Sequence, residues 1–165
     1  MPVAMTDRRT MFEALFTEHS TAVHRYVRRR APESDVEDIA ADVFVIAWRK
    51  LDEIPEGFEQ PWLFRTAWNV LANRRRRFVE LPFDQLPDAP GDGDIADTVL
   101  HDLTLQQAWL TLGARDREVL RLVAWEGLDG RGLAEALGIS VSGAGVALSR
   151  ARQRFDAACN GLSED

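Results

Sequence analysis

The stretch LDGRGLAEALGISVSGAGVALSRARQRF, residues 128–155, predicts two helices joined by a short turn. Asp129 is suited to cap the first helix, Gly138 to end it in a left-handed conformation, and Ser140 to cap the second. Two helices joined by a glycine-containing turn of three or four residues form the helix-turn-helix pattern found in many DNA-binding proteins. The stretch therefore predicts a small helical domain and raises the question of DNA binding.

The front of the second of these helices is unusual for a DNA-reading element. Residues 143–147 read Gly-Ala-Gly-Val-Ala, where Lys, Arg, Asn or Gln would be expected. The inward-facing stripe is predicted from helical spacing to comprise Val141, Ala144, Leu148, Ala151 and Phe155. The opposite side then carries Gly143, Ala147, Arg150 and Arg154. Its N-terminal part has only small side chains, and its C-terminal part is basic.

The rest of the chain also has helical periodicity, and strand signals are nearly absent. Residues 103–112 and 116–125 precede the helix-turn-helix and complete a predicted domain over 103–158. Towards the N-terminus, a first helical segment is broken at Pro32, and Ser34 with Glu37 forms a capping-box pattern for a second helix. A third helix, PWLFRTAWNVLANRRRR, has Pro61 in its first turn. These segments predict an all-α chain whose first domain covers 9–78.

An acidic segment separates the two predicted domains. Residues 79–102 contain three prolines, two glycines and no Lys or Arg. The segment also holds seven carboxylates, which equal the net charge of −7 of the whole chain. This composition favours a flexible, self-repelling linker, and a segment that docks on a partner remains an alternative. Because the flanking domains are close to neutral, the total charge does not argue against binding nucleic acid.

Composition excludes several other classes. The single cysteine, Cys159, can form no internal disulfide, which suits a reducing cytosol. We find no signal peptide and no apolar stretch long enough to insert in a membrane. The three histidines form no ligand pattern with Cys159, and no phosphate loop or nucleophile motif is present. We therefore expect a cytoplasmic protein without metal, cofactor or enzymatic activity.

Two of the N-terminal helices carry side chains that suggest binding. In the third helix, aromatic residues alternate with amide and basic side chains, a combination that suits unstacked bases. Asn69 and Asn73 share one helix face, and Asn lowers helix propensity unless it makes a contact. The alternative is an amphipathic core helix with a basic end. The acids of the second helix fit equally well a protein-docking face or carboxylates stabilised by the helix dipole.

Taken together, these segments resemble the extracytoplasmic-function (ECF) group of bacterial sigma factors. The resemblance rests on DVEDIAADVFVIAW, on PWLFRTAWNVLANRRRR, and on REVLRLVAWEGLDGRGLAEALGIS followed by LSRAR. It implies two all-helical domains, sigma-2 over 9–78 and sigma-4 over 103–158, that carry core RNA polymerase to promoter DNA. An anti-sigma factor is a further partner expected from the resemblance.

The resemblance also implies roles for individual residues. Those that would dock on core polymerase are Glu37, Asp38, Asp42, Phe44 and Trp48. Those that would melt and read the minus-10 element are Trp62, Phe64, Arg65, Trp68, Asn69, Asn73 and Arg76. Trp68 replaces a residue that is often Arg in the family, so the preferred minus-10 sequence is open.

The minus-35 contacts follow from the unusual front of the last helix. We expect Arg150, Arg152 and Arg154 to contact mainly phosphates, which position a protein without specifying sequence. Weak base reading is expected from Ser140, Ser142 and the methyl group of Ala147, the last against a thymine methyl. Two alternatives remain: a sigma-like regulator that binds polymerase or an anti-sigma factor but reads minus-35 poorly, and a plain helix-turn-helix DNA-binding regulator.

Overall fold

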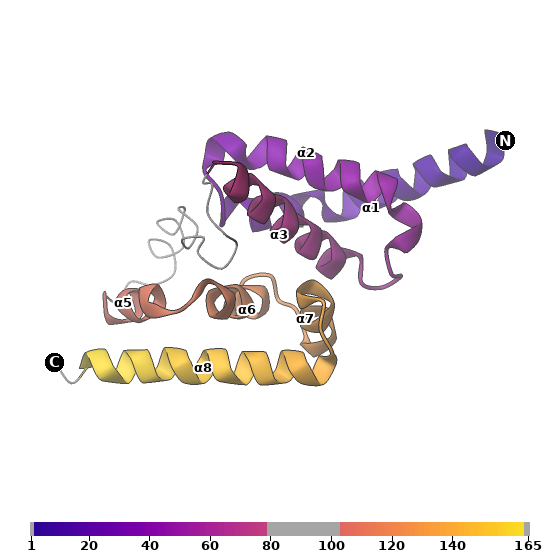
Figure 1. The fold of residues 1–165 in the computed structure, drawn as a ribbon. Coiled ribbons are helices and arrows are strands. Elements are labelled where there is room, and N and C mark those ends of the chain that lie inside the picture. The colour runs from indigo at the N-terminus through magenta and orange to yellow at the C-terminus, as the bar shows by residue number, and fades with distance from the viewer. Residues whose placement is uncertain (1, 79–102, 164–165) are drawn as a thin grey trace. The chain divides into compact units, whose positions relative to one another are not determined.

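The described residues of this computed structural model, 2–78 and 103–163, form two separate helical units (Figure 1). The acidic segment 79–102 lies outside the described residues. All regular elements in the described ranges are helices, which confirms the predicted all-α class. No single described helix could span a membrane; α7 and α8 reach the required length and composition only together, across a 95° bend.

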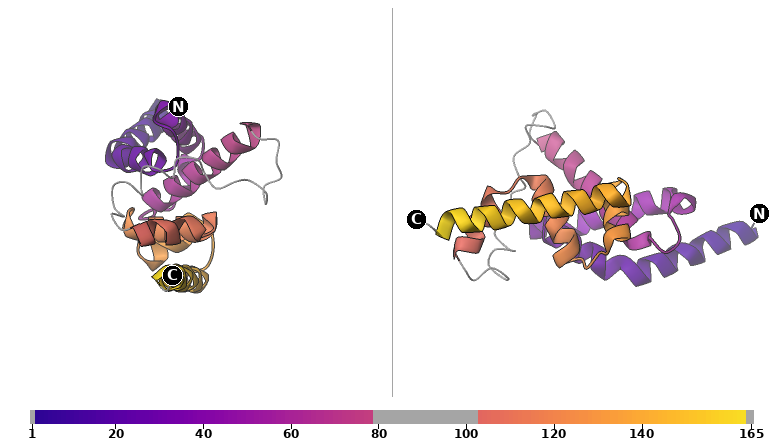
Figure 2. Two further views of the ribbon diagram at one scale, coloured as in Figure 1. Left: turned by 90° about the vertical axis from the view of Figure 1, so that its left-hand side faces the viewer. Right: turned by 90° about the horizontal axis from the view of Figure 1, so that it is seen from below.

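The N-terminal unit contains three long helices, α1 (Pro2–Arg28), α2 (Glu33–Arg49) and α3 (Glu59–Phe78), with a short 3-10 helix η1 (Leu51–Glu53) after α2. Each long helix packs on the other two. The first turns of α1 extend beyond the end of α2 (Figures 1 and 2), and Met5 on this extension is 71% exposed. The helix is thus longer at its N-terminus than the predicted domain boundary at residue 9.

A stack of three side chains forms the centre of this unit. The Tyr26 ring of α1 stacks on the Phe64 ring of α3, with the centroids 4.8 Å apart and the planes at 11°. On Tyr26 the guanidinium of Arg30 lies 3.5 Å from the ring centroid, and its Nη1 donates to the Tyr26 carbonyl over 2.8 Å. Arg30 is only 2% exposed, so its charge is buried, where a cation–π contact is strong.

The start of α2 differs from the prediction. The helix begins at Glu33, after Pro32 as the N-cap, and no side chain caps it. The capping box expected from Ser34 and Glu37 is therefore wrong, because Ser34 is already inside the first turn. The Pro32 carbonyl instead accepts from the Asp35 amide. Glu33 pairs with Arg28 of α1 at 3.1 Å, across the connection between α1 and α2.

The C-terminal unit packs three short helices along one long helix. The short helices are α5 (Leu103–Thr111), α6 (Ala114–Ala124) and α7 (Gly130–Leu137), and all three contact α8 (Val141–Ser163). Figure 2 shows α8 running alongside α5 and α6. Ala144 and Ala151 of α8 are completely buried, so the small side chains of α8 allow the shorter helices to approach closely.

The helix-turn-helix follows the predicted turn chemistry. The Asp129 side chain accepts from the Gly132 amide at 2.7 Å, and the Ser140 hydroxyl accepts from the Gly143 amide at 3.1 Å. Gly138 ends α7 with φ 66° and ψ 36°, the left-handed conformation. Val141 differs from the prediction: it is 56% exposed rather than part of the inward stripe. It begins α8 and lies beyond the packed turns, so helical spacing alone overstates its burial.

Gly138→Ala should destabilise the C-terminal unit by about 1 kcal/mol, because a Cβ in the left-handed conformation meets the following carbonyl. The measurement is hydrogen exchange of α7 and α8 peptides, in which exchange should accelerate. Gly161→Ala is the matched control, since a Cβ there meets nothing within 4 Å and the backbone is helical. Equal exchange in the two variants would contradict the role of Gly138.

Candidate protein and nucleic-acid interfaces

The acidic residues of α2 lie on its solvent side. Glu37, Asp38 and Asp42 are exposed, and Asp38 and Asp42 are separated by one helical turn. Val45, which is 49% exposed, follows three residues after Asp42. Glu37 lies towards α1, where its Oε2 is 3.4 Å from Nε2 of His24. The outer face of α2 thus combines two carboxylates with an exposed apolar side chain.

The two aromatic residues expected on this face have different environments. Phe44 is only 5% exposed and lies edge-on to Phe16, with ring centroids 4.8 Å apart. The Phe44 ring fills the α1–α2 contact, and its part in polymerase docking stays a prediction. Trp48 is 37% exposed, so part of its ring is available at the surface.

Trp48 is held by the N-terminal extension of α1. The Arg8 guanidinium lies 5.2 Å from the Trp48 ring centroid, donates to the Trp48 carbonyl and pairs with Asp52 at 2.7 Å. Phe12 lies edge-on to the same ring at 5.4 Å. We name Arg8, Phe12 and Trp48 the α1–α2 clip. Sequence reasoning missed Arg8, because nothing in the spacing of the chain relates residue 8 to residue 48.

The solvent face of α3 is a single row of polar side chains. Its members are exposed and follow spacings of four, four and three residues: Arg65, Asn69, Asn73 and Arg76. We name this row the α3 ridge. Trp62 and Trp68 are half-buried beside it. Phe64 is 1% exposed and stacks on Tyr26, so its ring lies in the core beneath the ridge, and its part in minus-10 binding stays a prediction.

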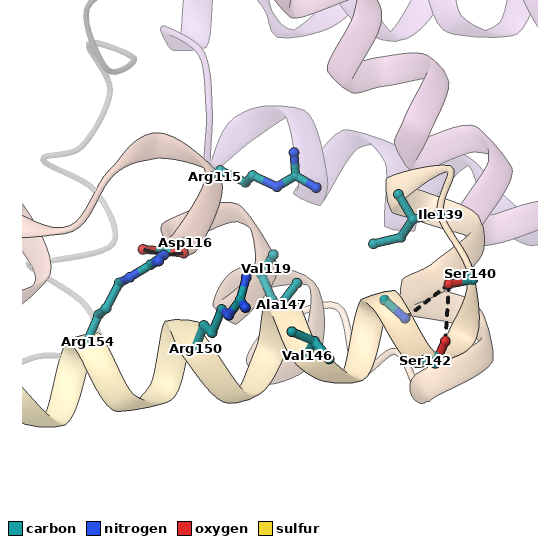
Figure 3. A pocket seen from close by; sticks show the side chains of 11 residues that line it. Arg115, Asp116, Val119, Ile139, Ser140, Ser142, Val146, Ala147, Arg150 and Arg154 are labelled. Carbon is teal, nitrogen blue, oxygen red and sulfur yellow. Dashed lines mark hydrogen bonds and ion pairs between the residues drawn. The ribbon is translucent and has the colours of Figure 1, made fainter.

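The front of α8 forms one side of a groove of about 650 Å³ in the C-terminal unit (Figure 3). Five residues of the expected minus-35 set line it, namely Ser140, Ser142, Ala147, Arg150 and Arg154, and Gly143 lies among them. The opposite side comes from α6, through Arg115, Asp116 and Val119, and Ile139 and Val146 complete the lining. Arg152 is exposed but does not line this groove.

The three arginines of the groove are not equivalent. Arg154 Nη1 contacts both carboxylate oxygens of Asp116 at 2.9 Å, and the Asp116 side chain is only 14% exposed. Within the described ranges, Arg115 and Arg150 have no ion-pair partner, and both are exposed. Two guanidiniums at the groove are thus available to an anion, whereas the third already has a counterion. Sequence reasoning missed Arg115, which precedes the helix-turn-helix.

A side chain added at each of the two glycines near the N-terminus of α8 would have a different effect. A Cβ on Gly143 would lie 3.0 Å from the Ser140 hydroxyl, the group that caps α8, whereas a Cβ on Gly145 would meet nothing within 4 Å. The Ser140 hydroxyl is also 3.3 Å from that of Ser142. Gly143 therefore protects the cap, and Gly145 leaves the surface of α8 open.

The comparisons with known proteins agree for both units. The family model for Sigma-70 region 2 matches residues 15–78, and that for Sigma-70 region 4 matches residues 102–155. RNA polymerase sigma factor CnrH of Cupriavidus metallidurans is 31% identical over 98% of this chain and 93% of its own length. RNA polymerase sigma factor NccH of Alcaligenes xylosoxydans xylosoxydans is 29% identical over 88% of this chain and 85% of its own length. The structure of CnrH in complex with the cytosolic domain of CnrY aligns with a TM-score of 0.60 and 28% identity, over 91% of this chain and 88% of that one.

Gly145→Ala should stabilise the C-terminal unit by about 1 kcal/mol, because alanine favours a helix over glycine and the site is open. Gly143→Ala should gain less, since the same preference is offset by displacement of the Ser140 cap, which is worth about 1 kcal/mol. Thermal unfolding of each variant, with exchange of α8 peptides to locate the change, measures the difference. Equal gains at both positions would show that the cap tolerates the added Cβ.

Proposed function

The chain belongs to the extracytoplasmic-function group of the sigma-70 family of bacterial RNA polymerase sigma factors, and we propose how its two units divide the work of initiation. The N-terminal unit over 9–78 docks on core polymerase through α2 and opens the minus-10 element with α3. The C-terminal unit over 103–158 contacts the minus-35 duplex with α8. Such a protein acts in the cytoplasm as a non-enzymatic initiation factor.

The observation that carries the minus-10 assignment is the α3 ridge. It places two amide side chains between two guanidiniums on an exposed face of α3. Amides can donate to and accept from base edges, and guanidiniums hold the backbone on either side. Trp62 and Trp68 are partly exposed beside the ridge and offer ring surface on which an extruded base can stack.

The polymerase-docking assignment is supported by the outer face of α2. Asp38 and Asp42 provide charge that orients an encounter with a basic surface, and the exposed parts of Val45 and Trp48 provide apolar contact area. Phe44 has an indirect role, since its ring sets the packing of α1 against α2. The α1–α2 clip keeps the exposed edge of Trp48 in one position.

An anti-sigma factor is the further partner that we propose. CnrH, a relative of known structure, was solved in complex with the cytosolic domain of CnrY. Its likeness to this chain extends over both units, which supports a comparable complex here. The minus-35 assignment has an alternative, a regulator that reads this element weakly, which is favoured by the absence of Lys, Arg, Asn and Gln from residues 141–149.

The proposed function is tested by transcription of fragmented genomic DNA from the source bacterium, with core polymerase and this purified chain. Sequencing of the RNA 5′ ends should reveal chain-dependent starts that share upstream sequence blocks. The absence of chain-dependent starts would contradict the proposal. Duplex binding by the chain alone, without polymerase, would instead favour a plain helix-turn-helix regulator.

On promoters found in this way, Asn69→Ala and Asn73→Ala should each reduce open-complex formation by about tenfold, because each removes an amide proposed to contact a base. Permanganate footprinting measures the opened bases. Asn160→Ala, the same change at an exposed position of α8, is the control and should have no effect. Full opening by both ridge variants would contradict the assignment of α3.

Asp42→Lys should weaken binding to core polymerase about threefold to tenfold at low salt, and less at high salt, because charge complementarity across an interface is screened by ions. Fluorescence anisotropy of labelled chain with core enzyme measures the affinity. Asp156→Lys changes the same charge at an exposed position of α8 and is the control. Equal affinities of the two variants would place the docking face elsewhere.

A further inference from the structure

The exposed surface at the start of α8 is apolar, which is unusual for a helix proposed to face DNA. Val146 is 49% exposed and lines the groove together with Ile139 and Val119. Beside Val146, Gly145 presents no side chain, and the space around it is open within 4 Å. The Val146 methyl groups are therefore accessible to a surface that approaches α8 closely.

Polar base reading is poorly supported at the same place. Residues 141–149 contain no amide and no basic side chain, and the hydroxyls of Ser140 and Ser142 lie 3.3 Å apart, within hydrogen-bonding distance of each other. The Ser140 hydroxyl additionally accepts from the Gly143 amide. Between Val141 and Ser149, the exposed side chain that lines the groove without a hydrogen-bonding group is that of Val146.

The major groove of DNA offers an apolar group on one base only. Thymine carries a C5 methyl there, and the other three bases present hydrogen-bonding groups. Arg115 and Arg150, which have no ion-pair partner within the described ranges, come from opposite sides of the groove, as Figure 3 shows. Phosphates held by these guanidiniums would bring the base edges of the same duplex towards Val146.

We propose that Val146 is a specificity-determining residue of this sigma factor, which reads a thymine methyl in the minus-35 duplex by van der Waals contact. The inference rests on the proposed function. It moves methyl recognition from Ala147, which is half-buried, to the more exposed neighbouring side chain. Arg115 and Arg150 anchor the backbone of the same duplex without selecting a sequence.

The test uses holoenzyme, formed from core polymerase and the full chain, on the strongest promoter found by start-site sequencing. Each thymine of the upstream block, on either strand, is replaced singly by deoxyuridine, which pairs identically and lacks only the methyl group. We expect one position, or two adjacent ones, at which open-complex formation falls about threefold to fivefold, the effect of one lost methyl contact.

Three variants identify the source of any methyl effect. Val146→Ala should initiate equally well on the thymine and deoxyuridine templates, whereas Val141→Ala, which alters an exposed valine outside the groove, should keep the wild-type difference. Arg150→Ala should lower opening on all templates by the same factor. These variants change exposed side chains, so circular dichroism and core binding should match the wild type.

The outcomes separate this inference from the proposed function. Chain-dependent initiation that is insensitive to every deoxyuridine would overturn methyl reading and leave the sigma-factor function intact. Methyl sensitivity that persists in Val146→Ala would assign the contact to another residue and overturn the role of Val146. Failure to find any chain-dependent start would reject the proposed function and this inference together.

Discussion

The stacking of Tyr26 between Arg30 and Phe64 determines which side of α3 faces water. A buried guanidinium needs a strong partner, and Tyr26 offers its ring face and its backbone carbonyl at once. The opposite face of Tyr26 is then covered by Phe64, which fixes the rotation of α3 about its own axis. Because Leu63 and Ala67 are also completely buried, the polar side chains that remain form the α3 ridge. The proposed DNA-reading face is thus set by the core beneath it.

The packing of the C-terminal unit depends on small side chains of α8. Its α8 holds three short helices on one side, and another side is the surface that we propose contacts DNA. Ala144 and Ala151 are completely buried and let neighbouring helices approach. Gly143 and Gly145 have no side chain, so the outer surface of α8 does not project at these positions. The ion pair of Arg154 with the largely buried Asp116 links α8 to α6 near one end of the groove. A helix with little side-chain bulk can therefore support both a core and a contact surface.

The features that are set by residues close together in the sequence could be predicted from the sequence. The turn between α7 and α8 depends on Asp129, Gly138 and Ser140, each of which acts within four residues of its own position. The all-α class follows from periodicity over long segments. The resemblance to sigma factors, which rests on the order of motifs along the chain, is confirmed by the family models for both regions.

The features that depended on tertiary contacts were not predictable in this way. Phe44 and Phe64 belong to chemically suggestive motifs, yet their rings are buried against α1, which no local pattern reveals. The α1–α2 clip joins residues forty positions apart. Arg115 reaches the groove from α6, a helix that the helix-turn-helix motif does not include. Helical spacing shows which residues share a face, and only the packing shows which faces meet.

The open space at Gly145 has a consequence for how this surface can change. A Cβ at residue 145 would meet nothing within 4 Å, and the backbone there is helical. A larger side chain can therefore be added at this position without steric conflict inside the unit. Change at residue 145 is thus limited by what the surface contacts and not by the fold.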